Sequence, residues 1–293
     1  MTHPEISLSC GDYAFPLLEH RHAMELVAML GFRHIDLAVM GNRSHVRPEH
    51  IRGDVAGAAE RLGAQLAAAG LELSDVFLIP WTDFETLAPN HPDAAERAAA
   101  RALFEEVLEL AARLRSPGIT LLPGIAWPGR SERDSLERAG EELQWRAERA
   151  AQRGLGCSIE PHIGSIVDTP EAVLALLELA PDLRLALDPT HFVARDVAQE
   201  RIHPLVMYAR HFHARGARSG LGQCAVKDNT VDYGRFVWAL QACGYEGAIA
   251  VEYVWIEWER MNECDNVSET ILMRDQLRAL LARGRDEEQE VVR

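Results

Sequence analysis

The chain has 293 residues, of which 47% are hydrophobic, so it can bury a large core in one large domain or two ordinary ones. It carries 45 acidic and 30 basic residues, a formal net charge of −15, and such a surface repels nucleic acids and anionic membranes. Five scattered cysteines without CxxC spacing indicate free thiols. Neither a signal peptide nor a bilayer-spanning apolar run is recognisable, so we expect a cytoplasmic protein without nucleic-acid or membrane partners.

Short β-like runs alternate with longer helical runs along the chain. The predicted strands span residues 6–10, 32–39, 72–80, 118–125, 157–161, 184–189, 209–214 and 248–254. Helical spacing of apolar residues marks residues 22–30, 49–70, 93–116, 132–154, 170–180, 232–244 and 269–284. Gly70 is placed to end one of these helices, and Thr169 before Pro170 is placed to cap another. The boundary within residues 205–211, where helix passes into strand, is the least defined.

This alternation, without a linker or repeat, predicts a single (β/α)₈ TIM barrel over residues 1–284. The competing architecture is a doubly wound open sheet with a small appended domain. It requires a glycine-rich phosphate loop after the first strand, and SLSCGDYAFP contains no such motif. The highly charged residues 285–293 are expected to form a flexible tail.

Acidic and imidazole side chains follow four successive strands in the second half of the chain. They are Glu160 in GCSIEPHIGS, Asp188 in LALDPTHF, His211 or His213 in RHFHARGA and Glu252 in IAVEYVW. Barrel active sites form where strands end, so these side chains can converge. Their oxygen and nitrogen donors suit Mn²⁺, Mg²⁺ or Co²⁺, and Zn²⁺ is also compatible. Each residue alone could instead cap a helix or form a salt bridge, but the joint pattern favours a metal site.

The motifs IEPHIGS, LDPTHF, HFHARGA and VEYVW resemble those of the xylose-isomerase-like TIM-barrel superfamily, the sugar phosphate isomerase/epimerase group. The resemblance covers about residues 155–275 and is only architectural before them. It implies one divalent cation, with Mn²⁺ favoured, on Glu160, Asp188, His213 and Glu252. It also implies that the two glutamates move the substrate proton. Substrate contacts are implied for His191 and for an arginine after the seventh strand, where Arg218 matches best and Arg215 is the rival.

Such a site would act on a sugar or hydroxy-ketone through an enediolate. Proton return to the same carbon from the opposite face gives epimerisation, and return to the neighbouring carbon gives isomerisation. His162, two residues after Glu160, could act as an additional acid or base, which would suit β-elimination from a keto sugar. A metal-dependent lyase or dehydratase is therefore the alternative. The structural interpretation of His162 is a neutral residue hydrogen-bonded to the loop after the sixth strand.

Residues of the first half would line the pocket walls. Trp81, Trp127, His45 and Asp36 end or follow early strands, and an aromatic ring such as Trp127 could stack on a sugar or plug a loop. The segment VWIEWERMNECDNVSET after the last strand, including Trp258, is expected to form a lip that covers the site or contacts another subunit of a homo-oligomer.

Two further classes remain as alternatives. An endonuclease-IV-like DNA-repair enzyme of the same superfamily would need a multi-metal cluster and a basic face, and the charge of −15 counts against it. A barrel without activity that serves as a binding subunit is disfavoured by the intact ligand set.

Overall fold

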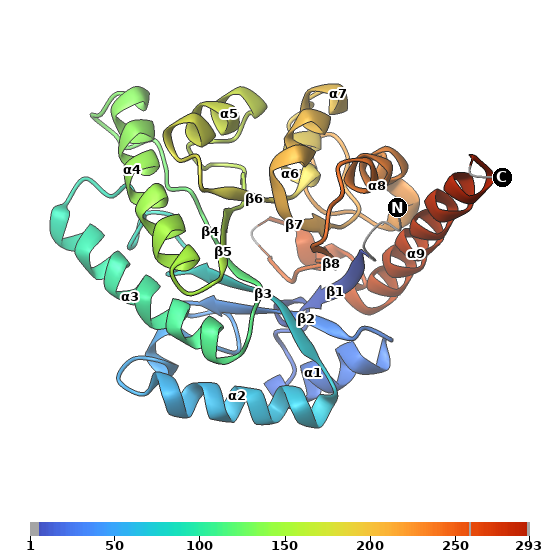
Figure 1. Cartoon of the computed structure of the whole chain (residues 1–293), viewed down its shortest axis with the longest axis horizontal. Helices are drawn as coiled ribbons and strands as arrows, with labels where there is room; N and C mark the ends of the chain where they lie inside the picture. Colours follow the sequence, from blue (N-terminus) through green and yellow to red (C-terminus); the bar gives the residue numbers. More distant parts are fainter. Residues whose placement is uncertain (1–5, 258, 292–293) are drawn as a thin grey trace.

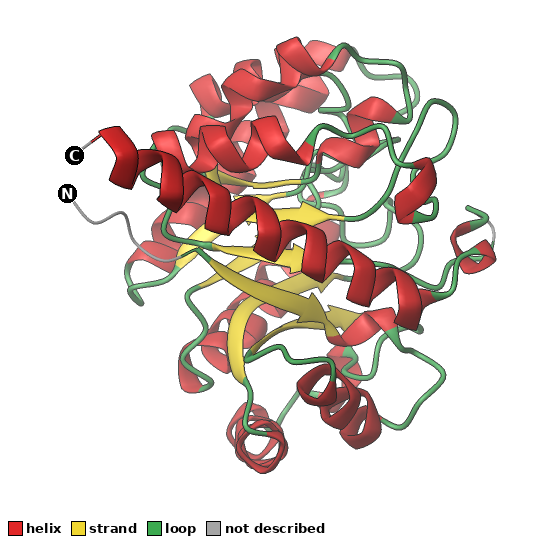
Figure 2. Cartoon of the chain, turned by 90° about the vertical axis from the view of Figure 1, so that its right-hand side faces the viewer, coloured by secondary structure: helices red, strands yellow, loops and turns green. Residues whose placement is uncertain are grey.

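The computed structural model describes residues 6–257 and 259–291. Its strands form one closed barrel in the order β1 to β8, and neighbouring strands are parallel throughout. The strands are β1 (Ser7–Gly11), β2 (His34–Met40), β3 (Glu72–Ile79), β4 (Gly118–Leu121), β5 (Gly156–Ile159), β6 (Arg184–Leu187), β7 (Ala209–Ala214) and β8 (Ala248–Val251). Helices surround them on the outside (Figures 1 and 2). The predicted (β/α)₈ barrel is confirmed.

The α-helices connect the strands and end the described chain. They are α1 (His20–Met29), α2 (Val55–Ala69), α3 (Ala94–Arg113), α4 (Glu132–Ala151), α5 (Pro170–Leu179), α6 (Pro189–Val193), α7 (Gln199–Ile202), α8 (Tyr233–Ala242) and α9 (Asn266–Val291). Short 3₁₀ helices are η1 (Asp12–Ala14), η2 (Pro48–His50), η3 (His203–Tyr208), η4 (Val226–Asp228) and η5 (Met261–Glu263). Within the described residues, no helix is long and apolar enough to cross a membrane.

Local sequence signals explain several of these boundaries. Gly70 ends α2 in the left-handed conformation with φ 68°, which glycine adopts at little cost. The Thr169 side chain accepts a hydrogen bond from the Ala172 N–H and caps α5. The undefined stretch before β7 is the 3₁₀ helix η3, which ends where the strand begins.

The C-terminal segment extends the last predicted helix beyond residue 284. Helix α9 continues through residue 291, so it includes most of residues 285–293; the last two lie outside the described residues. The short helices α6 and α7, between β6 and β7, were not anticipated by the helical spacing.

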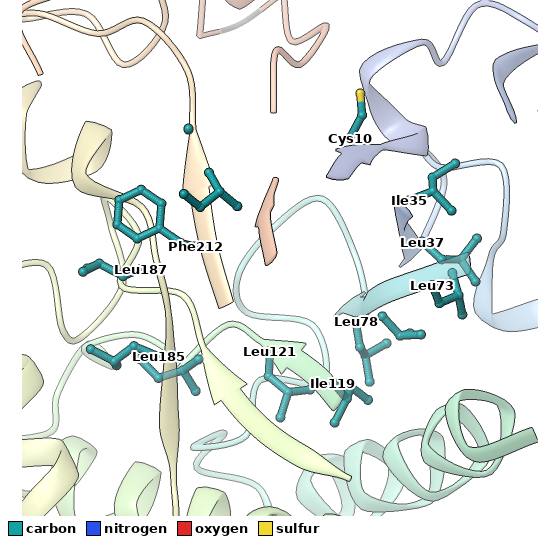
Figure 3. Packing of buried hydrophobic residues seen from close by; sticks show 14 of the residues in the cluster. Cys10, Ile35, Leu37, Leu73, Leu78, Ile119, Leu121, Leu185, Leu187 and Phe212 are labelled. Carbon is teal, nitrogen blue, oxygen red and sulfur yellow. The ribbon is translucent and has the colours of Figure 1, made fainter. Parts of the chain in front are cut away.

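The hydrophobic core lies between the strands and the helices. In β2, Ile35, Leu37 and Val39 are fully buried members of this core, whereas the alternate residues Ala38 and Met40 line a cavity at the barrel mouth. Figure 3 shows core side chains along the strands, including Ile35, Leu37 and others from β4, β6 and β7.

The barrel interior is unusually polar. TIM-barrel lumens are commonly filled with layers of bulky branched side chains. Here polar side chains from different strands hydrogen-bond to one another across the interior. They are Ser9, Asp36, Ser74, Asp75, Thr120, Ser158, Arg210 and His211. The helix-facing side of the strands therefore carries the apolar core, and the inner side leads into a polar site.

Candidate metal centre and active site

Four side chains predicted from separate strand ends meet at the mouth of the barrel. One ligand atom from each of Glu160, Asp188, His213 and Glu252 lies within 4.8 Å of those of the other three, and all four residues are buried. Glu160 follows β5, Asp188 follows β6, His213 lies in β7 and Glu252 follows β8. The carboxyl ends of four neighbouring parallel strands thus bring the residues together.

Asp188 is oriented by the helix that begins directly after it. Its Oδ1 accepts hydrogen bonds from the N–H of Thr190 at 2.8 Å and from the hydroxyl of the same residue at 2.6 Å, so Asp188 caps α6. Pro189 occupies the first turn, where its missing N–H costs nothing. Oδ2 is buried and has no hydrogen bond, but it forms an ion pair with Arg215, so one oxygen anchors the helix and the other takes part in the cluster.

His213 connects the two glutamates through one ring nitrogen. Its Nδ1 lies 2.6 Å from Glu160 Oε1 and 3.2 Å from Glu252 Oε2. His213 is fully buried, and Glu160 and Glu252 are nearly so. Nδ1 is therefore the histidine atom that joins the carboxylates in a common site.

The protonation of the cluster follows from its charges. Burial alone raises the pKa of both glutamates, but His191 and His213 hold the pKa of Glu160 well below its usual range, and His213 and Arg215 lower that of Glu252. Burial alone lowers the pKa of His213, yet Glu252 and Glu160 raise it well above its usual range. The glutamates are therefore ionised, and positive charge from neighbouring groups compensates them.

Arg215 is the arginine that reaches the site. Its Nη1 lies 2.6 Å from Glu252 Oε2, and its Nη2 lies 2.8 Å from Asp188 Oδ2. Its Nε donates to the Gly222 carbonyl at 3.0 Å, which fixes the guanidinium between the two carboxylates. Arg218, the better match to the resembling family, is exposed in the loop after β7 and does not line the cavity.

His191 and His162 lie beside the cluster. His191 Nε2 is 3.4 Å from Asp188 Oδ2, and its ring is 3.9 Å from the His162 ring, centroid to centroid. The Nδ1 of His162 is 2.7 Å from the Ile163 carbonyl, so this nitrogen carries the hydrogen that it donates. Burial, with His191 second, lowers the pKa of His162 to about 3, which leaves the imidazole neutral. The hydrogen bond is to its own neighbour rather than to the following loop.

A cavity of about 110 Å³ opens over these residues. Glu160, Glu252, His162, His191 and Arg215 form its polar end. The remaining walls are mainly apolar and come from the early strands and the segment after β8: Tyr13, Ala38, Met40, Phe77, Ile79, Phe84, Leu122, Val254, Trp255, Ile256 and Met261. The expected lip therefore covers the cavity on one side, although Trp258 lies outside the described residues.

The sequence pattern did not single out Tyr13, Phe77 or Phe84. Tyr13 is the clearest omission, because its buried hydroxyl has no hydrogen-bond partner in the structure and lines the cavity. Gly11 makes room for it, since a Cβ at that position would lie 2.6 Å from the tyrosine ring. The signal that could have found Tyr13 is its place directly after the first strand.

Other residues expected in the pocket walls lie elsewhere. Trp127 donates from Nε1 to Asn90 Oδ1 at 3.0 Å and does not line the cavity, which matches a plug under a loop. His45 stacks on His20 with ring centroids 4.7 Å apart. Asp36 is buried in the lumen, where His211 Nε2 lies 2.6 Å from its Oδ2.

The four residues fit a divalent cation. Three carboxylates and one imidazole are a hard, mixed donor set. Asp188 Oδ2 carries no hydrogen bond, although Arg215 Nη2 forms an ion pair with it at 2.8 Å, and His213 Nδ1 contacts both glutamates. Within the described residues, Asp36, His211 and His213 form another group of potential ligands, as do Glu160, His162 and His191. In the former, Asp36 is already hydrogen-bonded to His211.

Together, the closed barrel and the buried carboxylate–imidazole cluster at its mouth define a class: TIM-barrel proteins with a candidate metal centre at the carboxyl ends of the strands. The model of the xylose isomerase-like TIM barrel family matches residues 24–276. The chain therefore belongs to this family, which confirms the resemblance of its strand-end motifs.

Solved structures with the same fold include several sugar epimerases. D-Psicose 3-epimerase with D-tagatose from Clostridium cellulolyticum is 18% identical, with a TM-score of 0.72 over 94% of this chain and 99% of that one. L-Ribulose 3-epimerase is 15% identical, with a TM-score of 0.78 over 98% of each chain. A xylose isomerase-like TIM barrel protein from Mycobacterium smegmatis, in complex with magnesium, is 16% identical, with a TM-score of 0.73 over 97% and 98%. A comparison with curated proteins gave no match.

Proposed function

We propose that this protein is a divalent-metal-dependent isomerase or epimerase that acts on a sugar or hydroxy-ketone. The observation that carries the proposal is the buried group of Glu160, Asp188, His213 and Glu252, in which two glutamates flank one imidazole nitrogen. Family membership and the sugar epimerases among the structures of the same fold support the substrate class. Mn²⁺ is our first choice of cation, and the donor set also accepts Mg²⁺, Co²⁺ or Zn²⁺.

When bound, a divalent cation would stabilise negative charge that develops on the substrate oxygens. Glu160 and Glu252 supply the proton transfer, since both are ionised, both line the cavity and each contacts Nδ1 of His213. One glutamate removes the proton from the carbon beside the carbonyl. Either this glutamate then returns the proton, or the other glutamate, after taking up a proton from solvent, protonates the enediolate. Return to the same carbon from the opposite face produces the epimer, and return to the adjacent carbon produces the isomer.

Three further side chains would orient the substrate. Arg215 is fixed between two carboxylates and presents a permanent positive charge at the cavity, so it suits a substrate oxygen better than the exposed Arg218. His191 also lines the cavity. The unpartnered hydroxyl of Tyr13 can bond a substrate hydroxyl or carbonyl without first breaking a bond to the protein.

The test is solvent-deuterium exchange. Ketopentoses, ketohexoses and 3-keto-glucosides are incubated in D₂O with the Mn²⁺-loaded protein, and NMR follows the C–H group beside the carbonyl. We expect deuterium incorporation with formation of an epimer or isomer, and loss of both in EDTA. Elimination with release of a leaving group would replace this proposal by the lyase. Absence of exchange from the whole panel, or exchange unaffected by EDTA, would contradict it.

A further inference from the structure

The second ring nitrogen of His213 is buried without a hydrogen bond. Nδ1 faces Glu160 and Glu252, whereas Nε2 points to the other side and has no hydrogen-bond partner in the structure. Its charged neighbour is Asp36, whose Oδ2 lies 3.8 Å away, beyond normal hydrogen-bond length. A buried ring nitrogen that carries a hydrogen needs an acceptor, and here the nearby acceptor is a carboxylate.

Asp36 is held rigidly in this position. Ser9 donates to its Oδ1 at 3.0 Å, Ser74 donates to the same oxygen, and His211 Nε2 lies 2.6 Å from Oδ2. These partners belong to β1, β3 and β7, so three strands besides its own fix the carboxylate. Its orientation is therefore set by the barrel and does not depend on His213.

The tautomer of His213 decides whether it can be a ligand. A histidine binds a cation through a nitrogen that carries no hydrogen, so coordination through Nδ1 requires the hydrogen on Nε2. In the structure without a cation, Nδ1 donates a hydrogen bond to Glu160 at 2.6 Å, and a cation that binds there replaces this hydrogen. The hydrogen left on the ring then lies on Nε2, and Asp36 Oδ2, 3.8 Å away, is the nearby acceptor for it.

We propose that Asp36 is a positioning residue for the metal centre: it accepts the Nε2–H of His213 and thereby keeps Nδ1 available to the cation. The polar lumen is then part of the site, because Ser9, Ser74 and His211 hold the carboxylate that orients the ligand. This inference rests on the proposed metal-dependent function and adds a residue from β2, outside the four-ligand set.

Isothermal titration with Mn²⁺ alone tests the proposal on the full chain. Asp36→Asn should weaken Mn²⁺ binding by about 10- to 100-fold, since loss of such a partner typically costs that much. Asp75→Asn is the matched control: Asp75 is another buried lumen carboxylate, but it bonds Arg210 and Thr120 rather than a histidine of the cluster. It should lower the urea midpoint in EDTA while leaving Mn²⁺ affinity within about 2-fold.

A second measurement does not depend on whether Asp36→Asn folds. In the Mg²⁺-loaded wild type, ¹⁵N NMR of the imidazole rings should show the His213 hydrogen on Nε2, with His213→Gln used for assignment. A hydrogen on Nδ1, or equal losses of Mn²⁺ affinity in Asp36→Asn and Asp75→Asn, would overturn the inference. Unchanged affinity in Asp36→Asn would do the same. If the wild type itself does not bind Mn²⁺, the result contradicts the proposed metal-dependent function, on which this inference rests.

Discussion

At the scale of single residues, the alternation of a β-strand selects the arginine that enters the site. His211, His213 and Arg215 are two residues apart, so an extended chain turns all three to the same side. Arg218 comes after Gly216 and lies in the exposed loop. Periodicity therefore identifies Arg215, whereas comparison with a family motif favoured Arg218, because the loop after β7 differs from the usual spacing.

Substitution of Arg215 should lower the free energy of unfolding strongly, whereas substitution of Arg218 should hardly change it. Arg215→Met removes the positive charge between Asp188 and Glu252, and loss of one partner from buried ion pairs typically costs about 3–5 kcal/mol. Urea denaturation in EDTA should show this loss. Arg218→Met should change the free energy of unfolding by less than about 0.5 kcal/mol, as is usual for exposed sites. Equal effects of the two substitutions would refute the assignment of Arg215.

Replacement of Glu252 should abolish most of the turnover while the protein stays folded. Glu252→Gln keeps the shape of the side chain but removes its ability to accept a proton, so turnover should fall by about 100-fold or more. Thermal unfolding followed by circular dichroism should still show a cooperative transition. A folded, metal-loaded variant with undiminished deuterium exchange would exclude Glu252 from proton transfer.

At the scale of elements, a buried ion-pair network joins α3 to α4. Glu142 in α4 accepts two hydrogen bonds from Arg101 in α3, at 2.9 and 3.0 Å, and one from Arg146 at 2.9 Å. The guanidinium of Arg101 also lies 4.6 Å from the Trp145 ring centroid. Burial alone would raise the pKa of Glu142, but the bonds from Arg101 and Arg146 outweigh it and hold the pKa below its usual value.

This network should make stability depend on pH. Because the pKa of Glu142 is lower in the folded than in the unfolded chain, its stabilising effect is complete above the usual glutamate pKa of about 4.3 and is lost as the pH falls through the lowered folded value. The difference in unfolding free energy between wild type and Glu142→Gln should therefore be largest at neutral pH and shrink in acid. Urea denaturation across this range measures it.

Glu137→Gln is the control for that experiment. Glu137 pairs with Arg133 on the exposed surface of the same helix, where solvent screens the pair and its contribution to stability is small. The unfolding free energy of Glu137→Gln should differ little from that of the wild type at every pH. If the difference in unfolding free energy between wild type and Glu142→Gln did not change with pH, ionisation of Glu142 would not stabilise the α3–α4 contact.

At the scale of the whole molecule, the strand ends were the most predictable feature. Each apolar run predicts a buried strand, and a charged residue at its end predicts the barrel mouth. Glu160, Asp188 and Glu252 follow from this pattern, the family resemblance selects His213 over His211, and the four residues lie together. The cavity walls were less predictable because ordinary apolar side chains form them, and only the closed barrel brings these together. Trp127 illustrates the reverse error, since an aromatic ring after a strand can equally pack beneath a loop.

The C-terminal segment is helical beyond the range that the apolar spacing predicts. RDEEQE consists of residues with good or moderate helix propensity, and α9 continues through it. The polar lumen was also missed as a feature, because its serine, threonine and aspartate residues occur singly within otherwise apolar strands.

The most direct test of the account is titration of the metal-free protein with Mn²⁺ by calorimetry. The account predicts one equivalent of tightly bound ion, binding that is lost in Asp188→Asn combined with Glu160→Gln, and stabilisation of about 2.7 kcal/mol at a free Mn²⁺ concentration 100 times the dissociation constant. No binding by the folded wild type, or binding that survives the double substitution unchanged, would contradict it.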